Sequence, residues 1–227
     1  MMSVGRIIAR VARKLSPGFR TEKLKPALVA LESGCRVLDV GAWCAFPEPN
    51  PSENWLEKHA VGKGRVLAVG LEDMRDFRRA YPNVWCVQAD GCDLPFADHS
   101  IDVAVSNAVL EHVTEERRAD FVRELFRVAK RWAWFSVPDR WCPVEVHTKL
   151  PLVHWLPFWR RALRWCGHAY WALPSSLDLY TKRRLRKLLE SVHVAGGAWS
   201  LTRQHWYGIP VSLLVRYERN GKEGDGR

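Results

Sequence analysis

Several sequence features that mark specialised classes of protein are missing from this chain of 227 residues. No apolar run approaches the roughly 20 residues that span a bilayer. The first residues also lack the apolar core and small-residue cleavage site of a secretory leader. We therefore expect a cytoplasmic location.

Motifs for disulfides and metals are also missing. The six cysteines form no CxxC pair, and the eight histidines include no HExxH or other metal spacing. Four of the cysteines fall in or beside apolar segments, where a reduced thiol behaves as a small apolar residue. We predict neither a disulfide framework nor a metal site. The cysteines are Cys35, Cys44, Cys86, Cys92, Cys142 and Cys166.

The net charge of +10 is unevenly distributed along the chain. Residues 1–31 contain seven Lys or Arg and one acid, Glu22, and residues 158–190 contain eight Lys or Arg and two acids. Each stretch therefore carries +6, and the rest of the chain is close to neutral. This distribution indicates a directed positive surface.

From residue 35 onward the sequence alternates between short apolar segments and amphipathic ones. The apolar segments are β-branched and typical of buried parallel strands, and the others have helical periodicity. This alternation predicts a doubly wound α/β fold whose mostly parallel sheet is covered on both faces. The predicted strands are 36–40, 65–71, 84–89, 101–106 and 133–137, and the predicted helices are 53–59, 73–80 and 115–129.

The N-terminal segment differs from this pattern. Residues 6–15 have an apolar helical face beside arginines, and a second helix is predicted near residues 23–31. Residues 1–34 are therefore predicted to be a basic helical segment that precedes a domain of residues 35–219.

The region after residue 138 completes the predicted domain. Residues 139–176 are rich in Trp, Pro, His and Arg and contain no convincing strand, so we predict a cap or lid there. A helix at 181–190 and strands near 192–199 and 211–217 would bring the sheet to seven strands. Residues 220–227 are predicted to be a disordered tail.

Acidic residues and glycines follow the predicted strands, where ligands bind in such sheets. A nucleoside fits this arrangement better than a phosphate group, because Glu72 is placed to bind a ribose diol and Asp90 an adenine amino group. We predict that the cofactor is bound by Asp39, Gly41, Ala42, Glu72, Asp90, Gly91, Ser106 and Asn107.

The sequences LDVGA, VGLED, DLPFADHSIDVAVSNAVLEHV and RELFRVAKR occur in this order. Together they resemble the S-adenosylmethionine-dependent methyltransferases of class I, in the type 11 methyltransferase domain group, over roughly residues 36–137. The resemblance implies a Rossmann-like fold and S-adenosylmethionine as cofactor. It also implies that Asp39 and Gly41 belong to the first binding motif, and that Glu72 and Asp90 bind the ribose and adenine sides.

The chain departs from the family pattern at two positions. Trp43 and Ala45 stand where the family motif has its second and third glycines, and Trp43 could crowd the methionine part of the cofactor. The phrase PDRWCPVEVHTKLPLVHWLP is similar to a smaller subset of such methyltransferases, some of them encoded near bacterial surface-glycan genes. We interpret the altered loop as a variation and not as loss of function.

A hydroxyl acceptor would need a general base on the loops after the fourth and fifth strands. The candidates are His147, His112 and Asp139, with Glu145 as a further possibility. We favour His147 because the aromatic-walled segment that contains it would cover the acceptor. A structural role is the alternative for each histidine.

The acceptor class stays open at this point. A small-molecule, saccharide or lipid-linked acceptor leads, and no nucleic-acid partner is expected. A nucleic-acid methyltransferase is an alternative suggested by the basic ends, although the fourth strand ends in SNAV. A non-catalytic protein with this fold is another, whereas GAWCAF lacks the phosphate turn of an NAD enzyme.

The basic amphipathic segments suggest a peripheral contact with the inner face of a membrane. In residues 157–170, aromatic and apolar side chains alternate with Arg160, Arg161 and Arg164. The alternative is that their apolar sides belong to the protein core. The aromatic and apolar residues are Phe158, Trp159, Leu163, Cys166 and Tyr170.

Overall fold

The computed structural model describes residues 21–48, 53–60, 62, 65–145, 147–174, 176–193 and 196–220. The predicted amphipathic helix of residues 6–15 lies outside these residues, as does all of the predicted tail except its first residue. Among the described residues, none of the helices combines the length and the apolar character needed to cross a bilayer.

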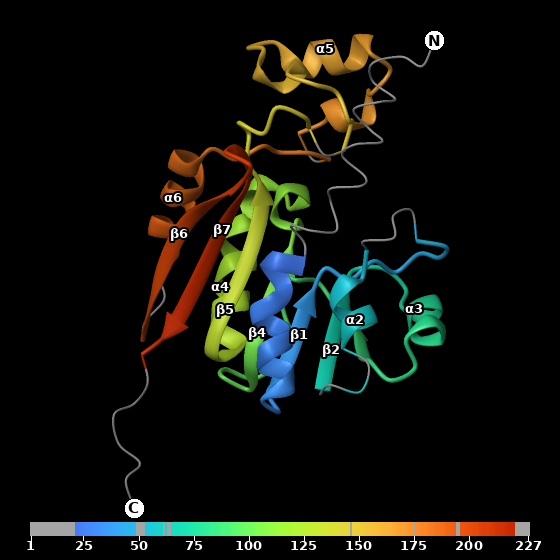
Figure 1. Ribbon diagram of the computed structural model, residues 1–227, viewed down its shortest axis with the longest axis vertical. Coiled ribbons are helices and arrows are strands. Elements are labelled where there is room, and N and C mark those ends of the chain that lie inside the picture. Colours follow the sequence, from blue (N-terminus) through green and yellow to red (C-terminus); the bar gives the residue numbers. More distant parts are fainter. Residues whose placement is uncertain are drawn as a thin grey trace, which may run out of the picture.

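Seven strands form one sheet in the order β3-β2-β1-β4-β5-β7-β6 (Figure 1). The first five run parallel to one another, and β7 is antiparallel to both of its neighbours. The prediction of a doubly wound, mostly parallel, seven-stranded sheet is therefore confirmed. The strands are β1 (Arg36–Val40), β2 (Arg65–Gly70), β3 (Trp85–Gln88), β4 (Ile101–Asn107), β5 (Ala129–Pro138), β6 (Gly197–Trp206) and β7 (Ile209–Arg219).

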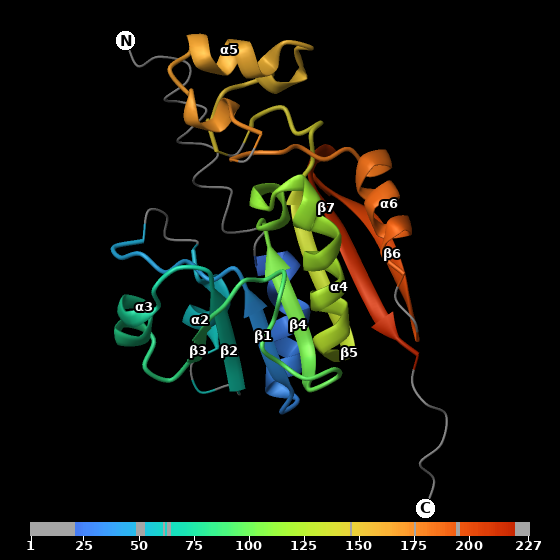
Figure 2. The same cartoon turned by 180° about the vertical axis from the view of Figure 1, so that it is seen from behind.

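Helices cover both faces of the sheet (Figures 1 and 2). Residues 21–32, α2 (Trp55–His59) and α3 (Arg75–Ala80) pack in one apolar cluster, and α4 (Arg118–Val128) and α6 (Lys182–Ser191) pack in another. In β1, Val37 belongs to the first cluster and Leu38 and Val40 to the second, because neighbouring side chains of a strand point to opposite faces. The core therefore lies on both sides of β1.

Local sequence signals explain two helix ends. The helix of residues 21–32 stops at Gly34, which has φ +80° and donates its N–H to the carbonyl of Leu31. At the start of α6, the Thr181 hydroxyl accepts a hydrogen bond from the N–H of Arg184. Both ends lie within two residues of the positions predicted from the sequence.

The sixth strand is the main error of the sequence prediction. The apolar residues near Val192 predicted a strand at 192–199, whereas β6 covers Gly197–Trp206. Val192 instead caps α6 and is buried against the core, and Gly196 then turns the chain with φ +79°. The prediction was wrong because burial at a helix end gives the same apolar signal as a strand.

Residues 139–176 lie beyond the carboxyl ends of β4 and β5 (Figure 1). No strand element forms in the described part of this segment, which contains the short helices η3 (Val153–Trp155), α5 (Trp159–Trp165) and η4 (Tyr170–Ala172). Trp159 and Leu163 are buried in a small cluster of its own together with Ala172, Leu177 and Leu179. This cluster is distinct from the two that flank the sheet. Residues 139–176 are called the cap below.

Candidate active site

The winding of the sheet reverses between β1 and β4. From β1 the chain moves outward to β2 and β3, and it then returns to the other side of β1 as β4. Ligands of open α/β sheets bind beyond the carboxyl ends of the strands at such a reversal. Most of the predicted cofactor residues lie on these strand ends.

The turn after β1 requires a glycine. Gly41 has φ +100°, and a Cβ atom there would collide with the side chain of Val109. The N–H groups of Gly41 and Ala42 both donate to the carbonyl of Val69, at 2.8 and 2.9 Å. The turn is therefore fixed to the end of β2, and its predicted contact with a cofactor stays a prediction.

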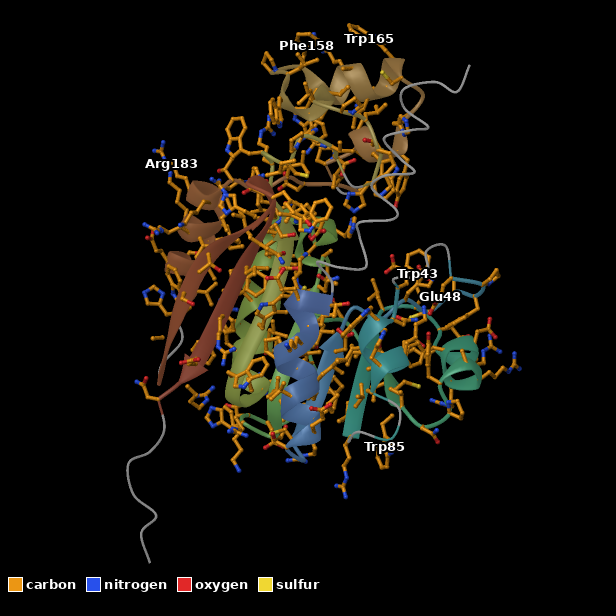
Figure 3. The ribbon with its side chains drawn as sticks, viewed as in Figure 1. Trp43, Glu48, Trp85, Phe158, Trp165 and Arg183 are labelled. Carbon is orange, nitrogen blue, oxygen red and sulfur yellow. The ribbon has the colours of Figure 1, made fainter. Side chains whose placement is uncertain are left out.

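Side chains hold the loop that follows this turn. The Asn54 side chain forms a reciprocal pair with the backbone of Trp43, accepting from its N–H at 2.8 Å and donating to its carbonyl at 3.0 Å. The Asn54 amide also donates to Glu48, which accepts from the Tyr81 hydroxyl at 2.6 Å and from Lys58. Figure 3 shows Trp43 and Glu48 together near the end of β2. These polar contacts fix the altered loop.

Trp43 is not the residue that fills the interior of the turn. Its side chain is 42% exposed, whereas Cys44 is buried. The Cys44 sulfur occupies the space over Gly70, where a Cβ atom would collide with it. Steric crowding of the cofactor by Trp43 stays a prediction, but the close backbone contact at the end of β2 is made by Cys44.

The carboxyl groups of Asp39 and Glu57 lie close together near the turn after β1. Glu57 on α2 is completely buried, and neither of its carboxyl oxygens has a hydrogen-bond partner among the described residues. Burial, reinforced by the negative charge of Asp39, raises the pKa of Glu57 well above its usual range. Glu57 therefore keeps its proton to a higher pH than an exposed glutamate does. The sequence analysis missed Glu57, whose position in a short amphipathic helix gave no signal.

The ends of β2 and β3 carry the next two acids. Glu72 is exposed, and among the described residues no ion pair or side-chain hydrogen bond occupies its carboxylate. Asp90 is half-buried, accepts the N–H of Cys92 at 2.8 Å and lies 3.5 Å from Arg117. A Cβ atom at Gly91 would crowd Phe121 on α4. Two carboxylates at neighbouring strand ends fit the hydroxyl and amino groups of a nucleoside.

The two residues that end β4 make hydrogen bonds within the sheet. The buried Ser106 hydroxyl donates to the carbonyl of Val40 at 2.8 Å and so joins β4 to β1. The Asn107 side-chain oxygen accepts from the hydroxyl of Ser136 at 2.8 Å. These contacts give both residues a structural role, and their predicted contact with the cofactor stays a prediction.

The structure brings two of the predicted catalytic residues together. The rings of His112 and His147 are perpendicular, with centroids 4.9 Å apart, and Trp171 of the cap lies against both. His112 follows β4 in η1 (Leu110–His112), and His147 lies in the cap. The Nδ1 atom of His147 lies 2.7 Å from a carboxylate oxygen of Glu145.

Glu145 is buried and ionised. Burial alone would raise its pKa, but the hydrogen bond and charge of His147 and the backbone N–H groups of His147 and Thr148 lower it to about 2. A carboxylate held in this way fixes the neighbouring imidazole in one tautomer and orientation. The other ring nitrogen of His147, Nε2, is left for a ligand.

Asp139 is placed differently from these residues. One of its carboxylate oxygens pairs with the Arg203 guanidinium at 2.5 Å, and the other accepts the N–H of Trp141 at 3.0 Å. The carboxylate is completely buried and joins the start of the cap to β6. Its geometry supports a structural role, and its predicted role as a base stays a prediction.

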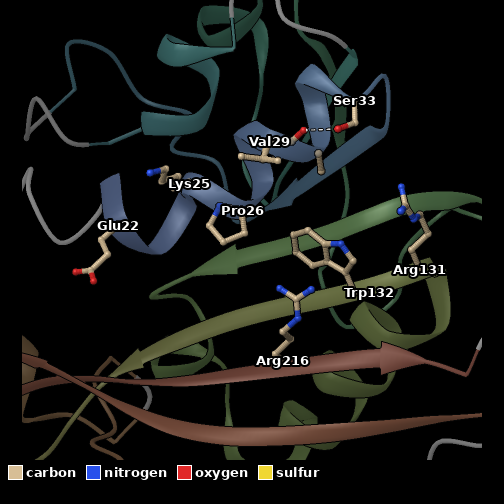
Figure 4. A pocket seen from close by; sticks show the side chains of 9 residues that line it. Glu22, Lys25, Pro26, Val29, Ser33, Arg131, Trp132 and Arg216 are labelled. Carbon is tan, nitrogen blue, oxygen red and sulfur yellow. Dashed lines mark hydrogen bonds between the residues drawn. The ribbon is translucent and has the colours of Figure 1, made fainter.

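A separate hollow of about 500 Å³ lies between the helix of residues 21–32 and the sheet (Figure 4). Trp132 and Arg216 line one side, with the guanidinium carbon 4.6 Å from the ring centroid, and Val29 and Pro26 line the other. This hollow lies on a face of the sheet and contains none of the predicted site residues.

Comparison with known proteins links this geometry to a family. A family model described as "Methyltransferase domain" matches residues 54–137. Two curated relatives from strains CDC 1551 and H37Rv of Mycobacterium tuberculosis, each named "Probable S-adenosylmethionine-dependent methyltransferase", are 38% identical over 68 residues. That stretch is 29% of this chain and 24% of each relative, so the chain matches about a quarter of their length.

Solved structures share the fold over nearly the whole chain. A SAM-dependent methyltransferase from Aquifex aeolicus covers 94% of this chain and 97% of its own length, with a TM-score of 0.51 and 18% identity. A magnesium protoporphyrin IX methyltransferase from Synechocystis PCC 6803 with bound SAH covers 97% of this chain and 89% of its own length, with a TM-score of 0.56 and 13% identity. A SAM-dependent methyltransferase from Mesorhizobium loti covers 87% of this chain and 98% of its own length, with a TM-score of 0.55 and 17% identity.

These matches confirm the resemblance to the type 11 methyltransferase group. The matched residues include Glu72, Asp90 and His112, whereas Gly41 and Trp43 precede them. The departure from the glycine pattern therefore lies outside the range that the family model matches.

Proposed function

We propose that this chain is an S-adenosylmethionine-dependent methyltransferase that acts on a small-molecule, saccharide or lipid-linked acceptor. The observation that carries the proposal is the set of carboxylates at successive strand ends beside the glycine-requiring turn at Gly41. The turn would contact the methionine part, Glu72 the ribose hydroxyls and Asp90 the adenine amino group. Asp39, which lies beside the buried Glu57, would supply a negative charge that stabilises the cofactor ammonium group.

Bound S-adenosylmethionine would supply an electrophilic methyl group, which moves in line to a lone pair of the acceptor while the electron pair of the broken bond stays on sulfur. The protein then has to align the acceptor, exclude water and accept a proton from a hydroxyl acceptor. His147 is suited to these tasks because Glu145 orients its ring at 2.7 Å and Trp171 packs against it.

Calorimetric titration with S-adenosylmethionine and with S-adenosylhomocysteine tests the cofactor assignment. Glu72→Ala should weaken binding by about one to two orders of magnitude, because charge-assisted hydrogen bonds to the ribose are lost. Asp73→Ala is the matched control, since the neighbouring acid is exposed and pairs with Arg75 at the start of α3. A wild-type protein that binds neither compound at millimolar concentration would favour the non-catalytic alternative.

A lipid-linked acceptor is supported by the exposed aromatic residues of the cap. Trp165 is 78% exposed and Tyr170 is 64% exposed, and Phe158 lies beside Trp165 with ring centroids 6.5 Å apart. Trp159 and Leu163 are buried instead, so only part of the predicted apolar set faces outward. We propose a cytoplasmic protein whose cap contacts the inner face of a membrane peripherally.

A further inference from the structure

We propose that Glu111, His112 and His147 bind a divalent first-row transition-metal ion. One potential ligand atom from each side chain lies within 4.8 Å of the others. Two ligand atoms of a tetrahedral ion, each about 2.1 Å from the metal, are about 3.4 Å apart. A bound ion would therefore have to draw the three groups together by roughly an ångström.

Glu111 supplies an independent reason to expect a cation. Its side chain is 1% exposed, and neither carboxyl oxygen has a hydrogen-bond partner among the described residues. A buried carboxyl group without partners is costly, and coordination of a cation would remove that cost.

Both histidines are held in the way that metal-binding histidines usually are. The His112 Nδ1 lies 2.7 Å from the carbonyl oxygen of Ser176, and the His147 Nδ1 lies 2.7 Å from a carboxyl oxygen of Glu145. A carbonyl or carboxylate oxygen accepts, so each Nδ1 donates its N–H, and metal binding would use the lone pair that Nε2 has in the neutral ring. Such outer contacts orient the ring and make it a stronger ligand.

The ligand set determines the type of ion. Two imidazoles and one carboxylate suit Zn²⁺, Fe²⁺, Co²⁺ or Ni²⁺ better than Mg²⁺, which prefers oxygen ligands. Three protein ligands also leave a coordination position open. The three residues come from the segment after β4 and from the cap, and an ion bound by them would make an acceptor oxygen there lose its proton more readily. With an ion bound, His147 would act as a ligand and not as the base.

Metal binding is measured without S-adenosylmethionine, so its outcome does not depend on the proposed function. The full chain is treated with EDTA and titrated calorimetrically with Zn²⁺, with Mg²⁺ as the comparison ion. We expect one Zn²⁺ per chain and much weaker binding of Mg²⁺. Glu111→Gln should weaken Zn²⁺ binding by about 100-fold or more, and Glu145→Gln by about 10- to 100-fold through its effect on His147.

The control variants are His193→Ala and His205→Ala, because both residues are exposed and lie outside the cluster. They should leave Zn²⁺ affinity unchanged. Glu111→Gln keeps the size of the side chain and removes a buried acid, so it should fold, and thermal unfolding without metal checks this. His112→Gln provides a second variant with the same expected loss.

Two results of the Zn²⁺ and Co²⁺ experiments would overturn the proposal even where the chain binds metal. One is a Zn²⁺ affinity that is the same in the wild type, Glu111→Gln and His112→Gln. The other is a thiolate-to-metal charge-transfer band in the Co²⁺-loaded wild type, which would show that cysteines are the ligands. A chain that binds no Zn²⁺ at all would contradict it as well.

Discussion

The side chain of Asn54 forms hydrogen bonds with both the backbone N–H and the backbone carbonyl of Trp43. A glycine there would not be needed to shape the loop, because the polar contacts already fix it. The Trp43 side chain is half-exposed, and Cys44 fills the interior of the turn. The loop thus keeps its shape without the glycines of the family pattern.

Trp43→Gly should therefore retain or improve the binding of S-adenosylmethionine while loosening the loop. Titration calorimetry of the wild type and the variant measures this directly. A variant that binds beside a wild type that does not would show that Trp43 blocks the site. A large loss of affinity in the variant would show instead that the indole helps to form it.

The buried Glu57 makes stability depend on pH. In the unfolded chain a glutamate loses its proton near pH 4.3, whereas burial and Asp39 raise the pKa of Glu57 in the native protein. The stabilising contribution is complete below the unfolded pKa and falls as the pH rises toward the native pKa. The slope is at most about 1.4 kcal/mol per pH unit.

Glu57→Gln should remove this slope and raise the free energy of unfolding at neutral pH relative to the wild type. Urea denaturation at several values from about pH 5 to about pH 8 measures it. Glu190→Gln, at an exposed position on α6, is the matched control. Parallel stability curves for the wild type and Glu57→Gln would contradict the assignment.

Neither Glu57 nor Glu111 could be recognised from the sequence as a buried acid. Both belong to short helices, and their burial results from packing against elements distant in the chain. In contrast, the position of Gly41 directly after the first strand could be predicted, because an acid and a glycine after an apolar strand are a local signal. The proximity of His147 to His112 depends on the cap and has no counterpart in sequence spacing.

At the scale of elements, buried strands were predicted best. The bounds of β1 agree with the prediction, and β4 differs by one residue, because most residues of both strands are buried and apolar. The edge strand β6 was misplaced, since one of its faces is exposed and its sequence contains polar residues such as Ser200 and Thr202. An edge strand is defined by its pairing partner, which the sequence does not reveal.

The cap is joined to this edge strand by the ion pair of Asp139 and Arg203. Asp139→Asn should lower the free energy of unfolding by about 2 kcal/mol, because a charged hydrogen bond is lost and Arg203 is left partly buried without its partner. Urea denaturation measures the change, and the exposed Asp73→Asn is the control. A variant with unchanged stability and no turnover would restore Asp139 as a candidate base.

Over the whole molecule, aromatic and positive groups gather at the cap end. Figure 3 places Phe158 and Trp165 at that end and Arg183 on the neighbouring α6, with Trp85 at the opposite end of the sheet. Each Lys or Arg near an anionic membrane adds about 1 kcal/mol, and aromatic rings insert at the headgroup level. The arrangement would place the His112–His147 cluster on the membrane side of the sheet.

Flotation with anionic vesicles tests this orientation. The wild type should float with the vesicles at low salt and be released as salt rises, because screening weakens the attraction of the arginines. The combined substitution Phe158→Ser, Trp165→Ser and Tyr170→Ser should reduce recovery, since it removes the side chains that would insert. Trp85→Ser should have no effect, although Trp85 is 79% exposed, because it lies at the other end of the sheet.

A wild type that stays in the soluble fraction even at low salt would contradict membrane contact through the cap. A freely soluble saccharide or small molecule would then be the better acceptor.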